Sequence, residues 1–412
     1  MHRRAALIAV GTELLTGLRN DTNGVWLARA LRRLGYTVVG RWIVPDADTA
    51  VQEALHAATR VAGVIVLTGG LGPTDDDRTR EAVAAFLGRA LEEAPTVRTR
   101  ILAYYSERSA TPPPIVLRMA RVIAGAEVLP NPVGAAPGMW IDARDRVYIL
   151  LPGPPAELQA VFEPAVRERL QQRATWPLPR WALFRTVGCP EVDIAERVKR
   201  IVDAYPGVEW SILPAPAQVD VELRMDAPDD STWSRLLADV RIALGDDCYA
   251  EEDIPIEAVI GRLLRQRGHT LAVAESCTGG LIGHRITNVP GSSEYFMQGY
   301  VVYSNAAKVA LLGVDPDTLQ RFGAVSEPVA VQMAKGARTR AQVTWAVAVT
   351  GIAGPTGGTP QKPVGTVHIA VAGPSGTVHQ KFRFNGTREQ IKWQSAQMAL
   401  DMLRRRLLHR ED

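Results

Sequence analysis

The residues with the clearest potential for chemistry are Ser276 and Cys277, which follow an apolar, strand-like run. The stretch 271–280 reads Leu-Ala-Val-Ala-Glu-Ser-Cys-Thr-Gly-Gly, and a helix-like pattern begins at Leu281. A nucleophile between a strand end and a helix start is exposed at the sheet edge, close to free N–H groups and the positive end of the helix dipole. This arrangement suits acyl transfer. A glycine-rich turn that needs small residues only for its shape has the same pattern.

A serine hydroxyl is a poor nucleophile unless a base stands next to it. Three histidines of this region lack an obvious aspartate to orient them, which disfavours a Ser-His-Asp triad: His269, His284 and His368. Lysine is the other base used with serine, and Lys308 follows a strand end and a Ser/Asn helix cap at 303–305. Burial would lower its pKa, whereas a surface lysine is the ordinary alternative. Cys277 remains a rival nucleophile, because thiolates are intrinsically more reactive.

Three loops add candidate ligand contacts. The segment 350–358, Thr-Gly-Ile-Ala-Gly-Pro-Thr-Gly-Gly, has the glycine density that lets a backbone approach a ligand. Arg388 opens the last helix, where it is well placed for a phosphate. The segment 68–77, Thr-Gly-Gly-Leu-Gly-Pro-Thr-Asp-Asp-Asp, joins a phosphate-type loop to carboxylates, and Mg²⁺ is usually held by one or two carboxylates plus substrate phosphates. Ordinary turns and an Asp-rich helix cap are the alternatives.

Alternating strands and helices must position these residues. The first part has strand-like runs and helix-like runs in turn, at 5–10, 23–34, 36–42, 49–62, 64–67 and 79–87. The final part repeats the pattern, with helices at 256–267, 306–312 and 328–340, strands at 270–274, 345–350, 366–372 and 378–384, and a long amphipathic helix at 387–408. This alternation predicts an α/β fold with parallel βαβ units. Ligands in such sheets bind at the carboxyl ends of the strands.

Between these parts lies a smaller module. A linker-like stretch at 171–180 and an acidic junction at 251–255 enclose a segment that reads strand, helix, strand, strand, helix. It predicts a small α+β module with no evident catalytic cluster.

Composition argues against several classes of protein. The 412 residues predict two or three domains, and 46% apolar and 22% charged residues are typical of globular cores. With 47 basic and 44 acidic residues, the net charge of +3 argues against nucleic acid or an anionic membrane as partner. Three cysteines are too few for a disulfide framework or zinc site, so a reducing cytoplasm is expected. The N-terminal apolar run ends at Gly11 and predicts a strand, and no run is long enough to span a membrane.

Residues 253–412 resemble the nicotinamide-nucleotide amidase domain of the CinA family of competence/damage-inducible proteins. The match rests on a series of blocks in order: Ala-Glu-Ser-Cys-Thr-Gly-Gly at 274–280, Pro-Gly-Ser-Ser at 290–293, Tyr-Ser-Asn-Ala-Ala-Lys at 303–308, Leu-Leu-Gly-Val at 311–314, Gly-Ala-Val-Ser-Glu-Pro at 323–328, Thr-Gly-Ile-Ala-Gly-Pro at 350–355 and Lys-Pro-Val-Gly-Thr-Val at 362–367. The resemblance implies cofactor-free hydrolysis of the carboxamide of nicotinamide mononucleotide to nicotinate mononucleotide and ammonia.

The same resemblance implies roles for individual residues. Ser276 would be the nucleophile and Lys308 the general base, with Tyr303 and Asn305 supporting them. The implied substrate contacts are Thr278, Gly279, Thr350, Gly351 and Arg388, with Arg388 facing the phosphate.

Residues 1–170 resemble the molybdopterin-binding-like domain of that family, on the segments 11–17, 21–23, 43–46, 68–81, 134–138 and 151–155. The resemblance implies an ADP-ribose pyrophosphatase that forms AMP and ribose 5-phosphate and depends on a divalent metal such as Mg²⁺ and on K⁺. It makes Asp46 and Asp77 catalytic and metal-binding, with Asp76 as a further metal ligand. The implied substrate contacts are Glu13, Asn23, Gly69, Gly70 and Gly72.

Residues 171–252 resemble the KH-like segment of the family, but they lack a Gly-x-x-Gly loop, so nucleic-acid binding is not expected. The leading hypothesis is a cytoplasmic, bifunctional enzyme of pyridine-nucleotide recycling with domains 1–170, 171–252 and 253–412. The resemblance also implies a homodimer. A competence- or recombination-associated binding protein is one alternative. A molybdopterin-cofactor-assembly protein is another, and it would leave Ser276 and Lys308 unexplained.

Overall fold

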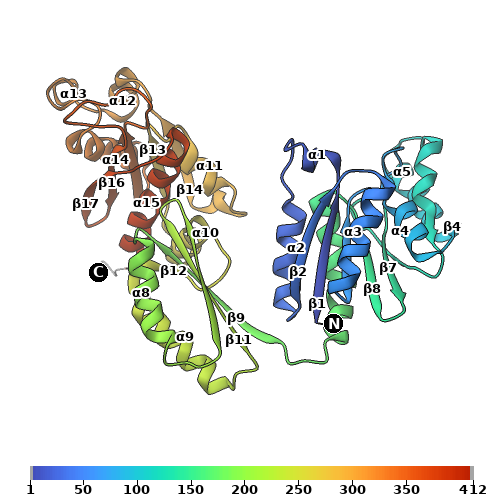
Figure 1. Ribbon diagram of the computed structural model, residues 1–412. Coiled ribbons are helices and arrows are strands. Elements are labelled where there is room, and N and C mark those ends of the chain that lie inside the picture. The colour runs from blue at the N-terminus through green and yellow to red at the C-terminus, as the bar shows by residue number, and fades with distance from the viewer. Residues whose placement is uncertain (1–2, 409–412) are drawn as a thin grey trace. The chain divides into compact units, whose positions relative to one another are not determined.

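A computed structural model describes residues 3–408 of the chain (Figure 1). The chain divides into two compact units, Met1–Arg180 and Trp181–Asp412. The outer ends of the first and last predicted domains, residues 1–2 and 409–412, lie outside the described residues.

The first unit is built on a six-stranded sheet in the order β2-β1-β3-β8-β7-β6. The first four strands in this order pair in parallel, and β7 and β6 pair antiparallel at one edge, which confirms the predicted parallel units. The bounds are β1 (Arg4–Val10), β2 (Thr37–Val44), β3 (Val64–Thr68), β6 (Glu127–Leu129), β7 (Gly138–Ala143) and β8 (Arg146–Leu151), and a separate pair is formed by β4 (Leu91–Glu93) and β5 (Arg121–Ile123).

Helices cover both faces of this sheet. They are α1 (Thr12–Leu15), α2 (Thr22–Arg33), α3 (Asp48–Val61), α4 (Thr79–Leu87), α5 (Pro95–Ser106), a 3₁₀ segment (Pro114–Ala120), α6 (Pro155–Val161), a π turn (Phe162–Val166) and α7 (Arg167–Arg173). The predicted stripe of α2 is buried, since Leu27 and Leu31 are fully enclosed with Val64 and Val66. The alternate β3 side chains, such as Ile65, join the core under α3 and α4 on the opposite face.

The carboxyl ends of the parallel strands meet at one edge of the first sheet. Gly11, Asp46, Gly69 and Pro152 follow β1, β2, β3 and β8, so the loops that carry the predicted residues gather there. Gly69 has φ +89°, and a Cβ at this position would overlap the carbonyl oxygen of Val10. Only glycine therefore lets the phosphate-type loop leave β3 so close to β1.

The segment expected as a middle module belongs to the second unit and forms its own four-stranded sheet, in the order β10-β11-β9-β12. Its elements are β9 (Pro179–Val187), α8 (Glu191–Val202), β10 (Val208–Ala215), β11 (Gln218–Asp226), α9 (Asp230–Leu244) and β12 (Cys248–Ala250). The predicted order of strand, helix, strand, strand, helix is confirmed, and the short β12 is added after it.

The rest of the second unit has a five-stranded sheet in the order β14-β13-β15-β16-β17. Strand β13 pairs in parallel with β14 and β15, whereas β16 and β17 continue antiparallel. The elements are α10 (Ile256–Arg267), β13 (Leu271–Glu275), α11 (Leu281–Thr287), β14 (Phe296–Val301), α12 (Asn305–Leu312), α13 (Pro316–Phe322), α14 (Glu327–Ala341), β15 (Trp345–Gly351), β16 (Thr366–Gly373), β17 (Gly376–Arg383) and α15 (Arg388–Leu408). One core lies under α10, α11 and α15, and another lies under α12 and α14.

The last helix differs from its amphipathic prediction, because it buries polar side chains as well as apolar ones. Asp401 and Arg404 are each 1% exposed and form an ion pair at 2.7 Å. Arg404 also donates to the carbonyl of Asp246, and Arg405 pairs with Asp247 at 2.9 Å. The buried charges are tolerated because each has a hydrogen-bonded partner of opposite sign or a carbonyl.

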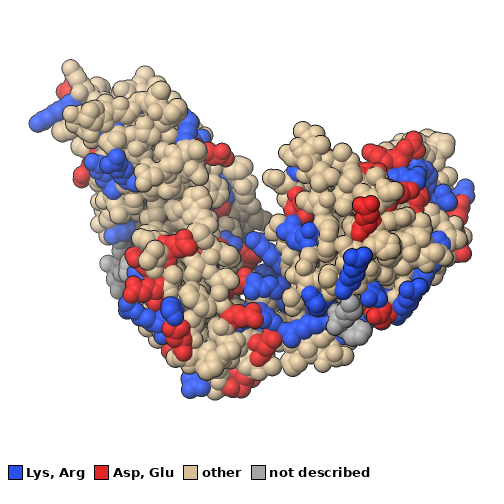
Figure 2. Space-filling view, viewed as in Figure 1, with Lys and Arg blue, Asp and Glu red and all other residues tan. Residues whose placement is uncertain are grey.

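Charge is mixed over the surface. Figure 2 shows basic and acidic side chains interspersed on the visible face, in keeping with the formal net charge of +3. Several are paired four residues apart, as are Arg167 with Glu163 and Lys199 with Asp203. Across residues 3–408, no helix has the length and apolar character that crossing a membrane requires.

Candidate active site

Ser276 directly follows β13, at the turn that leads into α11. Its N–H donates to the carbonyl of Val349 at 3.0 Å, which extends the pairing of β13 and β15 by one residue. The turn then needs left-handed backbone at Gly279 (φ +61°) and Gly280 (φ +95°). The predicted arrangement of strand, nucleophile and helix is therefore confirmed as a backbone arrangement.

The N–H groups at the start of α11 are not free for a nucleophile, which corrects one expectation. They bind Glu275, whose carboxylate accepts from Gly280 at 3.0 Å, Ile282 at 3.1 Å and Gly283 at 2.9 Å. Glu275 is 1% exposed, and a buried carboxylate without partners would cost several kcal/mol. The helix start thus stabilises Glu275, and the turn around Ser276 is held in shape as a result.

Lys308 lies one turn inside α12, and Ser304 caps this helix by accepting from the N–H of Ala307 at 3.1 Å. The Lys308 Nζ atom stands 3.1 Å from the Ser276 Oγ atom, 2.8 Å from the carbonyl oxygen of Val302 and 3.1 Å from that of Tyr303. The side chain is 1% exposed, and this burial lowers the pKa of Lys308.

The contacts of Lys308 suit a neutral amine. A neutral amine can donate its two N–H bonds to the carbonyls of Val302 and Tyr303. In the contact of 3.1 Å the Nζ atom donates to the Ser276 Oγ atom, and loss of that proton would let the amine accept the hydroxyl proton instead. This is the geometry that a general base requires.

Cys277 lines the same cavity as Ser276, but it also packs into an apolar core. It is 5% exposed, belongs to the apolar core under α10, α11 and α15, and its burial raises the pKa of the thiol to about 12. Thiolate is the reactive form of cysteine, so this environment disfavours nucleophilic attack by Cys277.

Ser276 and Lys308 open into a cavity of about 210 Å³, the serine pocket. The structure brings together here most of the residues predicted for this site: Ser276, Tyr303, Lys308, Thr350, Gly351 and Arg388. Arg388 donates to the carbonyl of Gly354 at 2.6 Å and to the Tyr303 hydroxyl at 3.1 Å. A Cβ at Gly351 would lie 2.7 Å from Val367 and 3.1 Å from the Cys277 sulfur atom, so only glycine leaves this wall in place.

Three predicted residues do not line the serine pocket. Thr278 is fully buried, and its hydroxyl has no hydrogen-bond partner among the described residues. Gly279 shapes the turn, and Asn305 is exposed at the first position of α12.

Lys392 was not predicted, and it lies near the turn at Gly279 without lining the serine pocket. Its Nζ atom lies 3.7 Å from the position that a Cβ of Gly279 would occupy. The signal was present, because Lys392 is four residues after Arg388 and neighbours it on the same face of α15. Ala324, Val325 and Ala353 of the pocket wall carried no such signal.

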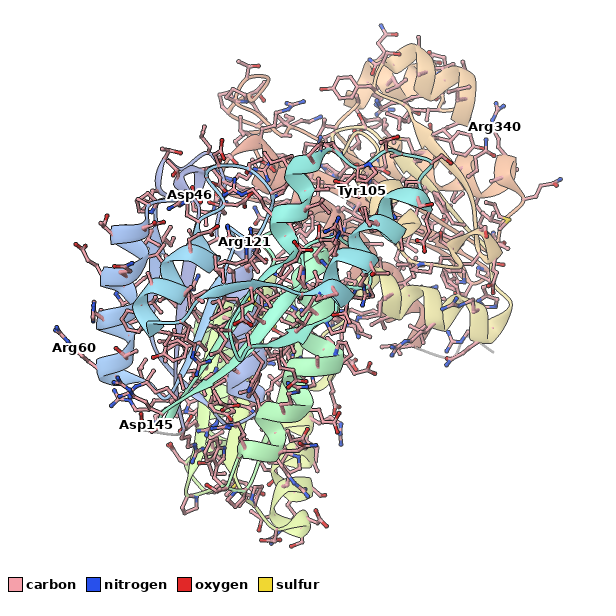
Figure 3. All side chains as sticks on the ribbon, turned by 90° about the vertical axis from the view of Figure 1, so that its right-hand side faces the viewer. Asp46, Arg60, Tyr105, Arg121, Asp145 and Arg340 are labelled. Atoms are coloured by element: carbon pink, nitrogen blue, oxygen red, sulfur yellow. The ribbon has the colours of Figure 1, made fainter. Side chains whose placement is uncertain are left out.

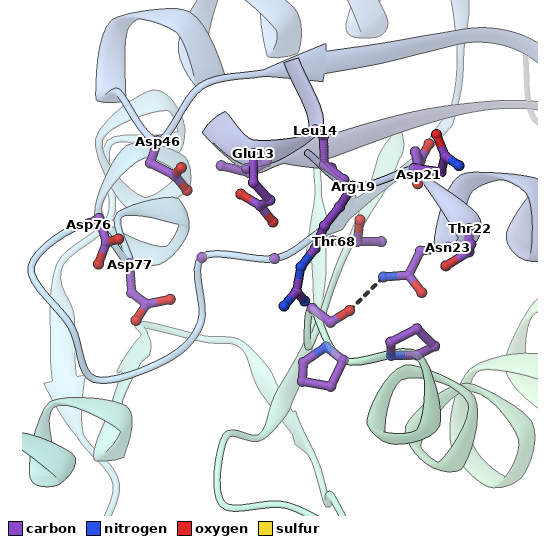
Figure 4. A pocket seen from close by; sticks show the side chains of 18 residues that line it. Glu13, Leu14, Arg19, Asp21, Thr22, Asn23, Asp46, Thr68, Asp76 and Asp77 are labelled. Carbon is purple, nitrogen blue, oxygen red and sulfur yellow. Dashed lines mark hydrogen bonds between the residues drawn. The ribbon is translucent and has the colours of Figure 1, made fainter. Parts of the chain in front are cut away.

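The loops at the carboxyl edge of the first sheet enclose a larger cavity of about 430 Å³, the acidic pocket. Figure 4 shows Asp46, Asp76 and Asp77 along one side of it and Asn23 on the other. Its lining includes the predicted residues Glu13, Asn23, Asp46, Gly69, Gly70, Asp76 and Asp77, together with Arg19, Asp21 and Thr68. Of the residues predicted in this unit, Gly72 does not line it.

Hydrogen bonds fix the two central carboxylates. Asp46 accepts from the N–H of Thr12 at 2.8 Å and from its hydroxyl at 2.9 Å. Asp77 accepts from the N–H of Thr74 at 2.9 Å and from its hydroxyl. Asp75, in contrast, pairs with Arg118 at 2.8 Å and does not line the pocket.

The carboxylates fit a divalent cation only in part. In the described part of the chain, no three His, Cys, Asp or Glu side chains gather as a ligand set. Mg²⁺ is usually held by one or two carboxylates and completes its octahedral shell with waters and substrate phosphates. Asp46 and Asp77 fit this partial role.

The pKa of Cys277 leads to a test of its reactivity. We expect iodoacetamide at pH 8 to modify Cys277 at least about a hundredfold more slowly in the native protein than in the chain unfolded in guanidinium, because a thiol pKa near 12 leaves little thiolate. Mass analysis of the peptide that contains Cys277 measures the rate. Equal rates in the two samples would show that this thiol is accessible and ionised in the fold.

Comparison with known proteins places this geometry in a family. Family models match residues 253–407, as the CinA C-terminal domain, and residues 6–172, as a probable molybdopterin binding domain. A CinA-like protein of Salinibacter ruber is 42% identical over 409 residues, 98% of this chain and 99% of the relative, and one of Solibacter usitatus is 40% identical over 411 residues, 98% of each chain.

Among solved structures, the competence/damage inducible protein CihA of Agrobacterium tumefaciens is 41% identical and covers 38% of this chain and 98% of its own, with a TM-score of 0.36. The sequence relatives show the family, because their identity to this chain extends over nearly the full length of both chains. This protein therefore belongs to the CinA-like family.

Proposed function

We propose that this protein is a bifunctional hydrolase of pyridine-nucleotide recycling. The second unit would deamidate nicotinamide mononucleotide, and the first would cleave ADP-ribose to AMP and ribose 5-phosphate. The observation that carries the first activity is the contact of 3.1 Å between the Lys308 Nζ atom and the Ser276 Oγ atom, at a lysine that is 1% exposed. The substrates themselves come from the family resemblance.

The amidase step follows from the protonation state of Lys308. The neutral amine takes the hydroxyl proton of Ser276 as the Oγ atom attacks the carboxamide carbon. The tetrahedral intermediate then expels ammonia, which leaves with the proton from Lys308, and an acyl ester on Ser276 remains. Water, deprotonated by the same lysine, hydrolyses the ester and releases nicotinate mononucleotide.

The phosphate of the substrate needs positive charge at the pocket mouth. Arg388 already donates to Gly354 and Tyr303, so its orientation is fixed before a ligand binds. Lys392, one turn further along α15, lies beside Gly279 of the adjoining turn and does not line the pocket. Arg388 supports the binding of a nucleotide rather than of a free nicotinamide ring.

Three alanine variants test the nucleophile and the base. Ser276→Ala and Lys308→Ala should each lower ammonia release from nicotinamide mononucleotide at least about a thousandfold, since the two residues act as one unit. Cys277→Ala should retain activity, because its thiol is buried and protonated. Ammonia assays on the full chain, with unfolding midpoints to verify the fold, measure the effect. Turnover retained in Ser276→Ala, or no release by wild type, would remove the assignment.

The pH profile tests the state of Lys308. Burial disfavours the ammonium form, so the neutral base is reached at lower pH than for an exposed lysine. We expect kcat/KM to rise with pH around a midpoint below the ordinary lysine value of 10.5. Tyr303→Phe is a matched control, because it removes a phenol hydroxyl from the pocket wall and should leave this midpoint in place. If kcat/KM no longer rose with pH in Tyr303→Phe, the rise would belong to Tyr303 and not to Lys308.

The proposal for the first unit rests on the carboxylates and glycines of the acidic pocket. A divalent metal held by Asp46 and Asp77 would neutralise pyrophosphate charge and favour attack by water. Asn23, whose amide donates to the carbonyl of Gly153 at 2.7 Å, joins two of the loops that would surround the ligand.

Neighbouring aspartates allow a matched test. Asp46→Asn and Asp77→Asn should each reduce AMP formation from ADP-ribose at least about a hundredfold and should leave ammonia release unchanged, because the second activity uses a separate site. Asp75→Asn should retain activity, since that side chain pairs with Arg118 outside the pocket. Chelation by EDTA should abolish AMP formation. An equal loss in Asp75→Asn, or full activity in EDTA, would contradict the proposal.

A further inference from the structure

A second cavity of the first unit, the tyrosine pocket, adjoins the acidic pocket at the phosphate-type loop. It has a volume of about 320 Å³, and its walls include Tyr104 and Tyr105 of α5, Met119, and the backbone at 70–73. The residues that line both cavities are Gly70, Asp77, Gly153 and Pro154. A ligand bound at Gly70 and Asp77 can therefore extend in two directions.

The walls of the tyrosine pocket suit a planar ring. The rings of Tyr104 and Tyr105 lie 5.7 Å apart at an angle of 73°, and both side chains are partly exposed. Met119 is 4% exposed and contributes a thioether. The Arg108 guanidinium lies 3.7 Å from the Tyr104 ring centre and restrains that ring. Figure 3 marks Tyr105 on its helix, and aromatic faces of this kind stack on nucleic-acid bases without needing a particular sequence.

The two cavities differ in chemistry. The acidic pocket has five carboxylates and no aromatic side chain in its lining, which suits sugar hydroxyls and metal-bound phosphate oxygens. The tyrosine pocket adds Glu157, whose Oε2 atom accepts from Asn131 at 2.7 Å. A carboxylate has further acceptor capacity, so Glu157 can also receive a ring amino group.

From this contrast we infer that the tyrosine pocket is the base-binding subsite of the first unit. The adenine ring of a nucleotide lies against Tyr104 and Tyr105, its phosphates lie at Gly70 and Asp77, and the sugar beyond them enters the acidic pocket. The identity of the whole ligand rests on the proposed ADP-ribose activity. Binding of the base does not depend on cleavage of the bond.

Calorimetry with two product probes tests this assignment in the full chain. AMP and ribose 5-phosphate share a phosphate and a sugar, and only AMP has a base. Replacing both tyrosine rings, in Tyr104→Leu/Tyr105→Leu, should weaken AMP binding about tenfold or more and leave ribose 5-phosphate binding unchanged. Tyr105→Phe, which keeps the ring, should bind AMP like wild type. Leu102→Ala, on the same helix but outside the pocket, is the matched control.

A measurement on wild type covers the case in which the double variant does not fold. AMP should protect Tyr104 and Tyr105 from nitration by tetranitromethane, and ribose 5-phosphate should not, as peptide masses would show. If AMP binding depends on the tyrosine rings but ADP-ribose is not hydrolysed, the base-binding subsite stands and the proposed activity of the first unit is wrong. Equal weakening of both probes, no weakening of AMP, or no protection by AMP would overturn the inference.

Discussion

The burial of Lys308 beside uncharged acceptors is the constraint on which the second unit depends. Among the described residues, its Nζ atom contacts one hydroxyl and two carbonyl oxygens. Glu275 lies next to Ser276 in sequence, yet its carboxylate accepts hydrogen bonds from the N–H groups at the start of α11. Were that carboxylate paired with Lys308, it would favour the ammonium form and leave the serine without a base. The fold gives Glu275 other partners, and burial lowers the pKa of Lys308.

The first unit gathers carboxylate oxygen atoms around one cavity. Three consecutive aspartates follow the glycine loop, but they are not equivalent. Asp77 is turned inward by Thr74, Asp76 lines the cavity, and Asp75 is drawn to Arg118. Three identical residues thus take different places in the structure. Asp75 forms an ion pair, whereas Asp76 and Asp77 line the cavity.

Local patterns predicted much of this molecule, because the decisive features are short in sequence. The β13 run, the glycine turn and the Ser304 cap are each read within ten residues, and they place Ser276 and Lys308 correctly on their elements. The 3.1 Å contact itself joins residues 32 positions apart and depends on how α12 packs. The role of Glu275 could not be predicted for the same reason, since the path of the backbone decides which N–H groups donate to its carboxylate. Thr278 and Asn305 belong to matching motifs, but they do not line the pocket.

The last helix gives the second unit a property that motif boundaries do not convey. Arg404 and Arg405 on α15 bind the carbonyl of Asp246 and the carboxylate of Asp247, which precede β12. The end of the chain is thereby fastened to a segment more than 150 residues earlier, as the separation of 158 positions shows. A cut near residue 253 would follow the sequence blocks, yet it would remove these two contacts and leave Arg404 and Arg405 with Asp401 as their remaining partner. The family-model boundary at residue 253 therefore does not coincide with the compact unit that begins at Trp181.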